Sequence, residues 1–339
     1  MDRKIIQKQI SRLPLSAFNK LKLYNYISRV RWKMSCTDAE YKRRIKSQIL
    51  VPSGSYYGQE HWIKKYSGYD DVIYAHIEHG VYFGNNRSKI GWEPEWELGN
   101  IITFGDSRRD LLNDMYPDYN ILPIGPRVHY APTDLLYKEE IKSKLLPDSK
   151  TMTLYPAHAI HDDKHSFNTQ QFLDDASELA KSLGVKNILV SLHPIDLANK
   201  AEILYEGMNV IVVSGGTENM NFLPRLRAIM ELSDLTYSNA LGTHVGYSIY
   251  LGTPLILDTS SNPPRQAGEF ASSVTNRYYE ERAVFEKVFS GRTEFSITPE
   301  QIDLCNFYWG FNYVKSPHVL YRELEYCKDN FIRNFKYQK

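Results

Sequence analysis

The run TMTLYP at residues 151–156 opens the stretch that decides the fold. Four further short apolar runs follow it: KNILVSLHP (186–194), MNVIVVSGG (208–216), DLTYSN (234–239) and TPLILDTS (253–260). Between these runs lie QQFLDDASELAKSLG (170–184), FLPRLRAIMELS (222–233) and a segment from about residue 242, all with helical spacing of apolar residues. Strands that alternate with helices in this way predict a doubly wound parallel sheet, whose ligands bind at the carboxyl ends of its strands.

The first half of the chain repeats this alternation. DDVIYAHIEHGVYFGNN (70–86) and NIITFGDSRRDLLNDMYP (100–117) each contain a strand-like run, and the second continues through a turn into a helix. Four prolines between residues 121 and 150 interrupt the pattern, and 339 residues suffice for about two domains. We therefore expect an α/β protein with two Rossmann-like domains facing across a cleft. The expected divisions are a first domain (1–130), a linker (131–150), a second domain (151–310) and a C-terminal helix (311–339) that packs back on the first domain.

Composition excludes several classes of protein. An apolar share of 42% and a charged share of 24% are those of a globular protein. The three cysteines lie far apart without a CxxC spacing, which argues against a disulfide framework, a zinc knuckle or a redox pair. No run of eighteen apolar residues occurs, and the opening MDRKIIQKQI lacks the apolar core of a secretory signal. We expect a cytoplasmic protein.

The first fifty residues are strongly basic. They hold thirteen Lys or Arg and three acidic residues, a net charge of +10, although the whole chain carries only +1. Apolar and aromatic residues are interleaved with these charges, as in surfaces that rest on anionic lipid. We expect contact with the inner face of the membrane through residues 1–50. A merely solvated helical face is the alternative, and nucleic acid is the least favoured partner.

Two loops of the second half carry histidines after a strand. His158 and His161 follow the run at 151–156 with a spacing that could suit a metal, but no third ligand with suitable spacing follows, so we expect no metal and assign both to the donor-binding loop. His193 ends the next run and precedes Pro194, which biases the chain to an extended path. His193 is therefore placed to donate to a phosphate or to protonate a leaving group; a structural histidine is the alternative.

A third loop, Thr236 to Gly246, ends a strand and opens a helix with small polar residues and glycines. Helix N-termini offer backbone N–H groups to phosphates, and glycine lets the backbone approach them closely. Ser238, Asn239, Gly242 and Thr243 are the candidate phosphate-binding residues. A plain helix cap at Ser238 or Asn239 is the alternative.

In the first half, Glu78 and His79 stand before Gly80 at the end of an apolar strand. Burial raises the pKa of a carboxylate and nearby positive charge lowers it, so Glu78 could be adjusted to take a proton from a sugar hydroxyl. His79 could do the same work. A salt-linked loop without a catalytic role is the alternative.

Together these motifs resemble those of bacterial GT-B transferases that use CMP-linked or CDP-linked donors. That group includes sialyltransferases, capsule and O-antigen Kdo transferases, and teichoic-acid glycerophosphotransferases. The resemblance covers roughly residues 70–260 and is carried by Glu-His-Gly (78–80), His-Pro (193–194) and Ser-Asn-x-x-Gly-Thr (238–243). It implies that Glu78 or His79 is the base, that His193 is the acid for the leaving group, and that Ser238, Asn239 and Thr243 hold phosphate.

The chain also departs from that pattern. Sialyltransferases have a second acidic residue where His79 stands and a serine pair where Ser238 and Asn239 stand, which argues against sialic acid. The teichoic-acid enzymes share a His-Gly motif in the first half, which leaves polyol-phosphate transfer open.

The expected function is therefore transfer of a sugar, such as Kdo, from a cytidine-nucleotide donor to a growing surface polysaccharide or lipid-linked acceptor. The donor is a substrate, and neither a cofactor nor a metal is expected. The rival functions are transfer of a polyol phosphate, epimerisation of a nucleotide sugar on the same fold, and a non-catalytic role in glycan assembly.

Overall fold

The computed structural model describes residues 53–84, 98–157, 167–193, 196, 201–205, 210–212, 219–262, 274–290 and 295–335. The basic segment 1–50 lies outside the described residues, as do His158, His161 and Pro194. The expectations for these positions remain predictions.

The first half forms a three-stranded parallel sheet. Its strands are β1 (His76–Ile77), β2 (Asn100–Thr103) and β3 (Asn120–Pro123), in the order β1-β2-β3. The central strand β2 is buried at every residue, as expected of a parallel strand covered on both faces, whereas β1 and β3 at the edges are buried only in part. Helix α5 (Asp106–Met115) connects β2 to β3.

The second half forms a five-stranded sheet that is also entirely parallel. Its strands, in chain order, are β4 (Thr151–Tyr155), β5 (Asn187–Ser191), β6 (Val210–Val212), β7 (Leu235–Ser238) and β8 (Leu255–Leu257). In space they are arranged β6-β5-β4-β7-β8, so the order reverses between β4 and β7. This is the order of a doubly wound Rossmann-like sheet. The predicted fold class, α/β with two Rossmann-like halves, is confirmed.

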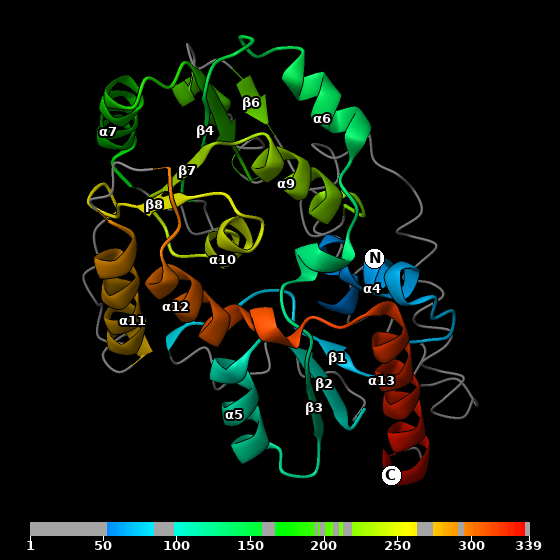
Figure 1. Cartoon of the computed structure of the whole chain (residues 1–339). Coiled ribbons are helices and arrows are strands. Elements are labelled where there is room, and N and C mark those ends of the chain that lie inside the picture. Colours follow the sequence, from blue (N-terminus) through cyan, green and yellow to red (C-terminus); the bar gives the residue numbers. More distant parts are fainter. Residues whose placement is uncertain are drawn as a thin grey trace.

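The helices cover both sheets, as Figure 1 shows. The α-helices of the first half and the connecting segment are α4 (Gln59–Ser67), α5 and α6 (Leu135–Lys142). Those that follow are α7 (Thr169–Ser182), α9 (Phe222–Glu231), α10 (Thr243–Tyr250), α11 (Val274–Phe289), α12 (Pro299–Trp309) and α13 (Pro317–Asn330). Short 3₁₀ turns are η1 (Ser53–Gly58), η3 (Arg127–Tyr130), η4 (Ala201–Tyr205) and η5 (Phe311–Tyr313), and the π-helical turn η6 (Phe331–Phe335) follows α13. None of the helices within the described ranges is long and apolar enough to cross a bilayer.

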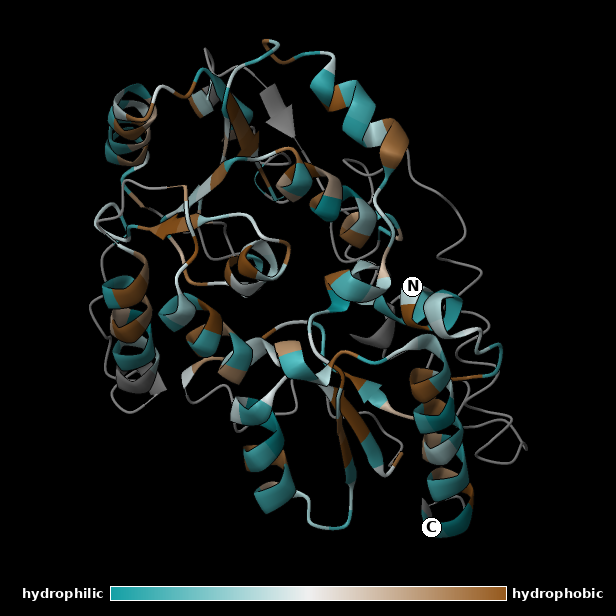
Figure 2. Ribbon diagram, in the orientation of Figure 1, coloured by the Kyte–Doolittle hydropathy of each residue, from teal (hydrophilic) through white to brown (hydrophobic). Residues whose placement is uncertain are grey.

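The C-terminal helices connect the two halves. Helix α12 begins with a capping box between Thr298 and Gln301 and with Pro299 at its first position, where a missing N–H costs no helical hydrogen bond. After α12 the chain returns to the first sheet, where α13 packs beside α4 and β3. Leu320 and Leu324 of α13 are fully buried in that core. Figure 2 shows hydrophobic residues in β2, β4 and β8, and mainly hydrophilic residues along α5.

Gly310 fixes the crossing point of this connection. It ends α12 in the left-handed region with φ of 72°. A Cβ atom at Gly310 would lie 2.4 Å from the carbonyl oxygen of Phe104, and one at Gly125 would lie 2.7 Å from the carbonyl oxygen of Gly310. Because Phe104 follows β2 and Gly125 follows β3, the carboxyl edge of the first sheet faces the junction with the second half.

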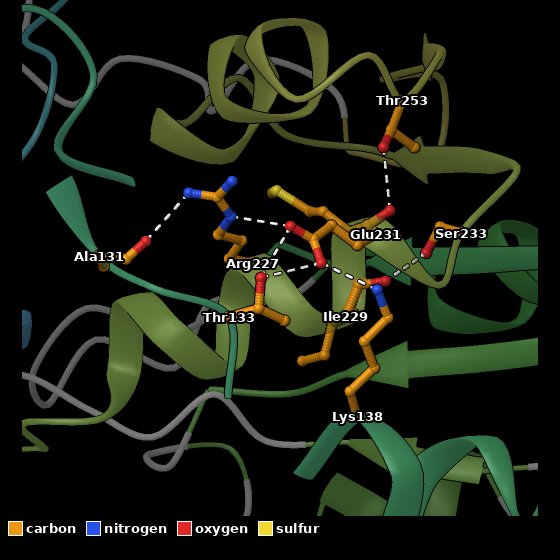
Figure 3. A network of polar contacts seen from close by, with 9 residues as sticks. Ala131, Thr133, Lys138, Arg227, Ile229, Glu231, Ser233 and Thr253 are labelled. Atoms are coloured by element: carbon orange, nitrogen blue, oxygen red, sulfur yellow. Dashed lines mark hydrogen bonds and ion pairs between the residues drawn. The ribbon is translucent and has the colours of Figure 1, made fainter. Parts of the chain in front are cut away.

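The segment between the two sheets is tied to α9 by one carboxylate (Figure 3). Glu231 accepts hydrogen bonds from Thr133 at 2.9 Å, from Lys138 at 2.9 Å and from Arg227 at 2.8 Å, and Arg227 also donates to the carbonyl oxygen of Ala131 at 3.0 Å. Burial acts to raise the pKa of the Glu231 carboxyl, but these donors hold that pKa below its usual value. The connecting segment is therefore anchored on the second half along its length.

The sequence predicts that the proline-rich segment from residue 121 interrupts the alternation of strands and helices, but the structure has regular elements there. Ile121 to Pro123 belong to β3, and helix α6 lies within the stretch expected to be a linker. β3 stands at the edge of its sheet, where a proline is tolerated because its missing N–H leaves no ladder bond unmade.

Candidate active site at the junction of the two sheets

The reversal of strand order in the second sheet marks a ligand-binding position. β4 and β7 are neighbours in the sheet although β5 and β6 lie between them in the sequence, and in doubly wound sheets such a reversal is where ligands bind, outside the carboxyl ends of the strands. Tyr155 ends β4, Ser238 ends β7, and α10 begins after Gly242 without a side-chain cap. The third predicted loop therefore lies at the switch point of the sheet.

Ser238 and Asn239 differ from the expectation that they hold phosphate directly. Both are fully buried. The Ser238 hydroxyl donates to the carbonyl oxygen of Tyr155 at 2.8 Å, and the Asn239 amide accepts from the N–H of Ala157 at 2.7 Å and donates to Ser261 at 3.1 Å. Neither caps α10, whose N-cap residue is Gly242. Their polar atoms fasten the ends of β4, β7 and β8 together, so in this structure they shape the loop.

Thr243 brings the two predicted motifs into contact. The N–H of Val81, in the loop after β1, donates to the Thr243 hydroxyl at 3.2 Å. A Cβ atom on Gly80 would lie 3.0 Å from the same hydroxyl oxygen, so the glycine permits this close approach. The Glu-His-Gly loop of the first half therefore touches the start of α10 in the second half.

Two further aromatic residues support the start of α10. His244 stacks on Tyr155 with 4.9 Å between ring centroids, and its Nε2 lies 2.9 Å from the Ser238 hydroxyl. Trp309 of α12 is fully buried and donates from Nε1 to the Thr243 carbonyl oxygen at 2.9 Å. Neither was singled out from the sequence, because both act through contacts between distant segments.

Glu78 is held by an ion pair. The side chain is 4% exposed. Oε1 accepts from Nε of Arg108 at 2.7 Å and also pairs with its Nη2, while Oε2 accepts from the Thr103 hydroxyl at 2.6 Å. Both oxygens are engaged, so Glu78 matches the salt-linked alternative, and its ion pair holds the strand end beside His79.

His79 is set among aromatic rings. Its ring centroid lies 5.4 Å from that of Tyr56, 6.2 Å from that of Tyr57 and 5.9 Å from that of Tyr82. Its carbonyl oxygen accepts from the buried Gln59 amide at 2.8 Å, whereas Nδ1 is buried and finds no hydrogen-bond partner among the described residues. Burial lowers the pKa of His79 to about 4. The imidazole is therefore neutral near pH 7 and able to accept a proton.

His193 lies on the same edge of the second sheet as Tyr155, because β5 is the neighbour of β4. It stands two residues beyond the end of β5 and is partly buried. Its carbonyl oxygen accepts from the N–H of Asp196 at 2.9 Å. The predicted position of His193 at a strand end is confirmed, and its role toward a donor stays a prediction. Within the described part of the chain, no three His, Cys, Asp or Glu side chains are grouped as metal ligands.

The proteins found to be similar to this chain are solved structures, at low sequence identity and with TM-scores below 0.5. No protein-family model matches the chain, and no curated protein matches its sequence. Among solved structures, the wall teichoic acid polymerase TagF matches at 15% identity over 76% of this chain and 68% of that one, with a TM-score of 0.41. The UDP-GlcNAc 2-epimerase from Neisseria meningitidis, bound to UDP-GlcNAc, matches at 16% identity over 77% and 70%, with a TM-score of 0.38.

Sucrose-phosphate synthase from Thermosynechococcus elongatus matches at 10% identity over 82% of this chain and 72% of that one, with a TM-score of 0.33. The matched proteins thus include transferases and an epimerase. At such identities and scores the likeness carries no activity over to this chain, so the functional argument rests on the site.

Proposed function

We propose that this protein is a transferase that moves a group from a nucleotide-activated donor to a hydroxyl acceptor, with His79 as the general base. The observation that carries the proposal is the contact between Val81 and Thr243. It joins the loop that carries His79, whose imidazole is partly exposed, to the first residue of the helix at the switch point of the second sheet. A base and a phosphate-binding position on facing halves are what group transfer from a nucleotide requires.

The reaction then follows from the placement of these groups. His79 takes the proton from the acceptor hydroxyl as its oxygen bonds to the donor carbon. The bond from that carbon to the nucleotide phosphate breaks, and the nucleotide leaves with the electron pair. The start of α10 and His193 stabilise the negative charge that gathers on the departing phosphate. This role needs no metal in the proposed scheme.

A cytidine nucleotide is the proposed donor, on the strength of the His-Pro and Ser-Asn motifs. A sugar such as Kdo is the proposed group, and the acceptor is a surface polysaccharide or its lipid-linked precursor. Transfer of a polyol phosphate is the second candidate, favoured by His79 itself, since a His-Gly pair also occurs in the resembling glycerophosphotransferases. In that case the acceptor oxygen bonds to phosphorus instead of carbon. Residues 1–50 are proposed to hold the protein at an anionic membrane surface, on the cytoplasmic side.

Two variants test the base. His79→Asn removes the proton acceptor, so transfer should fall by about 10²- to 10⁴-fold with nucleotide affinity nearly unchanged. Glu78→Gln keeps the shape of the ion-paired residue and should lower activity less, through displacement of the strand end. Full activity in both variants would refute the choice of loop. Loss of activity in Glu78→Gln alone, with His79→Asn active, would return the role of base to Glu78.

A thermal-shift panel of CMP, CDP, UDP and GDP tests the donor. A ligand at about 100 times its dissociation constant stabilises the folded state by about 2.7 kcal/mol. We expect CMP or CDP to give the largest shift, and a larger shift with UDP or GDP would reassign the donor. Product analysis separates the rivals: an epimerase interconverts free nucleotide sugars without an acceptor, and a non-catalytic protein tolerates His79→Asn.

A further inference from the structure

Four partly exposed rings come together around the proposed base. They are His79 itself, Tyr57 from η1, Tyr82 from the loop after β1, and Phe222 at the start of α9. Tyr57 lies 4.4 Å from Phe222 and 6.2 Å from His79, measured between ring centroids. Tyr82 approaches His79 edge-on at 5.9 Å. The cluster therefore spans both halves, and each of its four residues is partly exposed.

The backbone at Tyr57 is held in an unusual conformation. Its φ is 58°, in the left-handed region that bulky residues rarely adopt. The next residue, Gly58, has a φ of 82°, and a Cβ atom there would lie 2.4 Å from the carbonyl oxygen of Met220. Trp62 donates to that same carbonyl oxygen at 2.8 Å. The turn is thus pressed onto the second half, and its strained residue carries the ring that packs on Phe222.

The chemistry of this cluster of rings favours a ring-shaped sugar. Aromatic rings offer an apolar face, and a pyranose presents a matching face of C–H groups, whereas an acyclic polyol phosphate presents charge and no flat face. Arg108 lies 4.7 Å from the centre of the Tyr82 ring, but Glu78 already pairs with it. The charge of Arg108 is therefore already balanced by Glu78, and it gives the cluster of rings no net positive charge to attract an anionic acceptor.

We infer that Tyr57 and Phe222 form an acceptor subsite that stacks a pyranose ring, so that the acceptor is a glycan and not a polyol phosphate chain. The inference rests on the proposed function, because His79 as the base defines where the acceptor hydroxyl lies. The Tyr57 ring lies 6.2 Å from that of His79 and contacts Phe222, so the pair lies near the proposed base, where the sugar that carries that hydroxyl would bind. The donor nucleotide is assigned to the carboxyl ends of β4 and β7, where α10 begins at Thr243.

Saturation-transfer NMR on the full chain tests the subsite, with a panel of methyl pyranosides and glycerol 3-phosphate as probes. We expect at least one pyranoside to receive saturation on the protons of one ring face. Tyr57→Leu should reduce that signal by about fivefold or more, and Tyr57→Phe should retain it, since only the ring is needed. Glycerol 3-phosphate should give no signal that depends on Tyr57.

The same variants in the nucleotide thermal-shift panel separate this inference from the proposed function. A CMP or CDP shift that persists in Tyr57→Leu agrees with an acceptor subsite. Loss of that shift would assign the rings to the nucleobase of the donor and overturn the inference. Pyranoside binding that is equal in wild type and Tyr57→Leu would also overturn it. So would the absence of any pyranoside binding. Absence of any nucleotide shift in the wild type would instead refute the proposed function. Unfolding midpoints of both variants show whether the fold is retained.

Discussion

The N–H of Val81 donates to the hydroxyl of Thr243 at 3.2 Å, although the two residues belong to different halves of the chain. Val81 follows the His79 loop, and Thr243 begins the helix at the switch point. This hydrogen bond therefore joins the loop of the proposed base to the proposed phosphate-binding position. Gly80 makes the approach possible, because a side chain there would press on the same hydroxyl.

Replacing Thr243 tests this contact. Thr243→Val keeps the branched shape but leaves the Val81 N–H without its acceptor, which should cost about 1 kcal/mol of unfolding free energy and weaken the nucleotide thermal shift. Thr243→Ser keeps the hydroxyl and serves as the control. Urea unfolding and the thermal-shift panel measure both effects. If the Ser variant loses as much as the Val variant, the methyl group and not the hydroxyl matters.

Gly246 is required by the packing of Trp309. A Cβ atom at Gly246 would lie 2.1 Å from the Trp309 ring, which is fully buried and bonded to the Thr243 carbonyl. Helix propensity alone predicts that Gly246→Ala stabilises α10 by about 1 kcal/mol. Overpacking of a core costs about 1–3 kcal/mol, so we expect a net loss in urea unfolding.

A double-mutant cycle provides the control for Gly246. In a Trp309→Phe background the smaller ring makes room, so Gly246→Ala should cost less there than in the wild type. An equal cost in both backgrounds would mean that the ring is not the obstacle. A gain in stability in the wild type would show that the helix moves aside freely.

The parts of the fold that could be predicted are those that depend on the spacing of apolar residues within short windows of sequence. Strands and helices of the second half alternate within short windows, so a parallel sheet with loops at one edge followed from the sequence. β3 was not predicted, because Pro123 argues against a strand unless that strand is known to lie at the edge of a sheet. Edge position depends on which strands pair, and that information is not local.

The sequence predicted which loops carry the candidate site, but not the directions in which their side chains point. The sequence indicates that Ser238 and Asn239 end a strand, yet it does not indicate where their side chains point. Asn239 bonds to Ala157, 82 residues away, and that contact turns its amide into the protein. Likewise, the pairing of Tyr57 with Phe222 joins two halves of the chain and has no signature in residue spacing. The structural role of Glu78 became clear only from its ion pair with Arg108, which lies 30 residues away in the sequence.

The low pKa of His79 makes a prediction about acid stability. The usual histidine pKa of 6.5 applies to the unfolded chain, and burial lowers that of folded His79 to about 4. Between these values the unfolded state binds a proton that the folded state excludes, so stability falls as pH falls through this window. From about pH 7.5 to about pH 5 the loss due to His79 should be at most about 2 kcal/mol, reduced by the partial exposure of the ring.

His79→Gln removes the titrating group, so the difference in unfolding free energy between the variant and the wild type should change with pH over this window. Urea unfolding at the two pH values measures it, with His318→Gln at an exposed histidine as the matched control. A wild-type curve that runs parallel to the His79→Gln curve would mean that folded His79 takes up a proton as readily as the unfolded chain. In that case the imidazole would be charged in mild acid, and burial would not be the reason that it is neutral near pH 7.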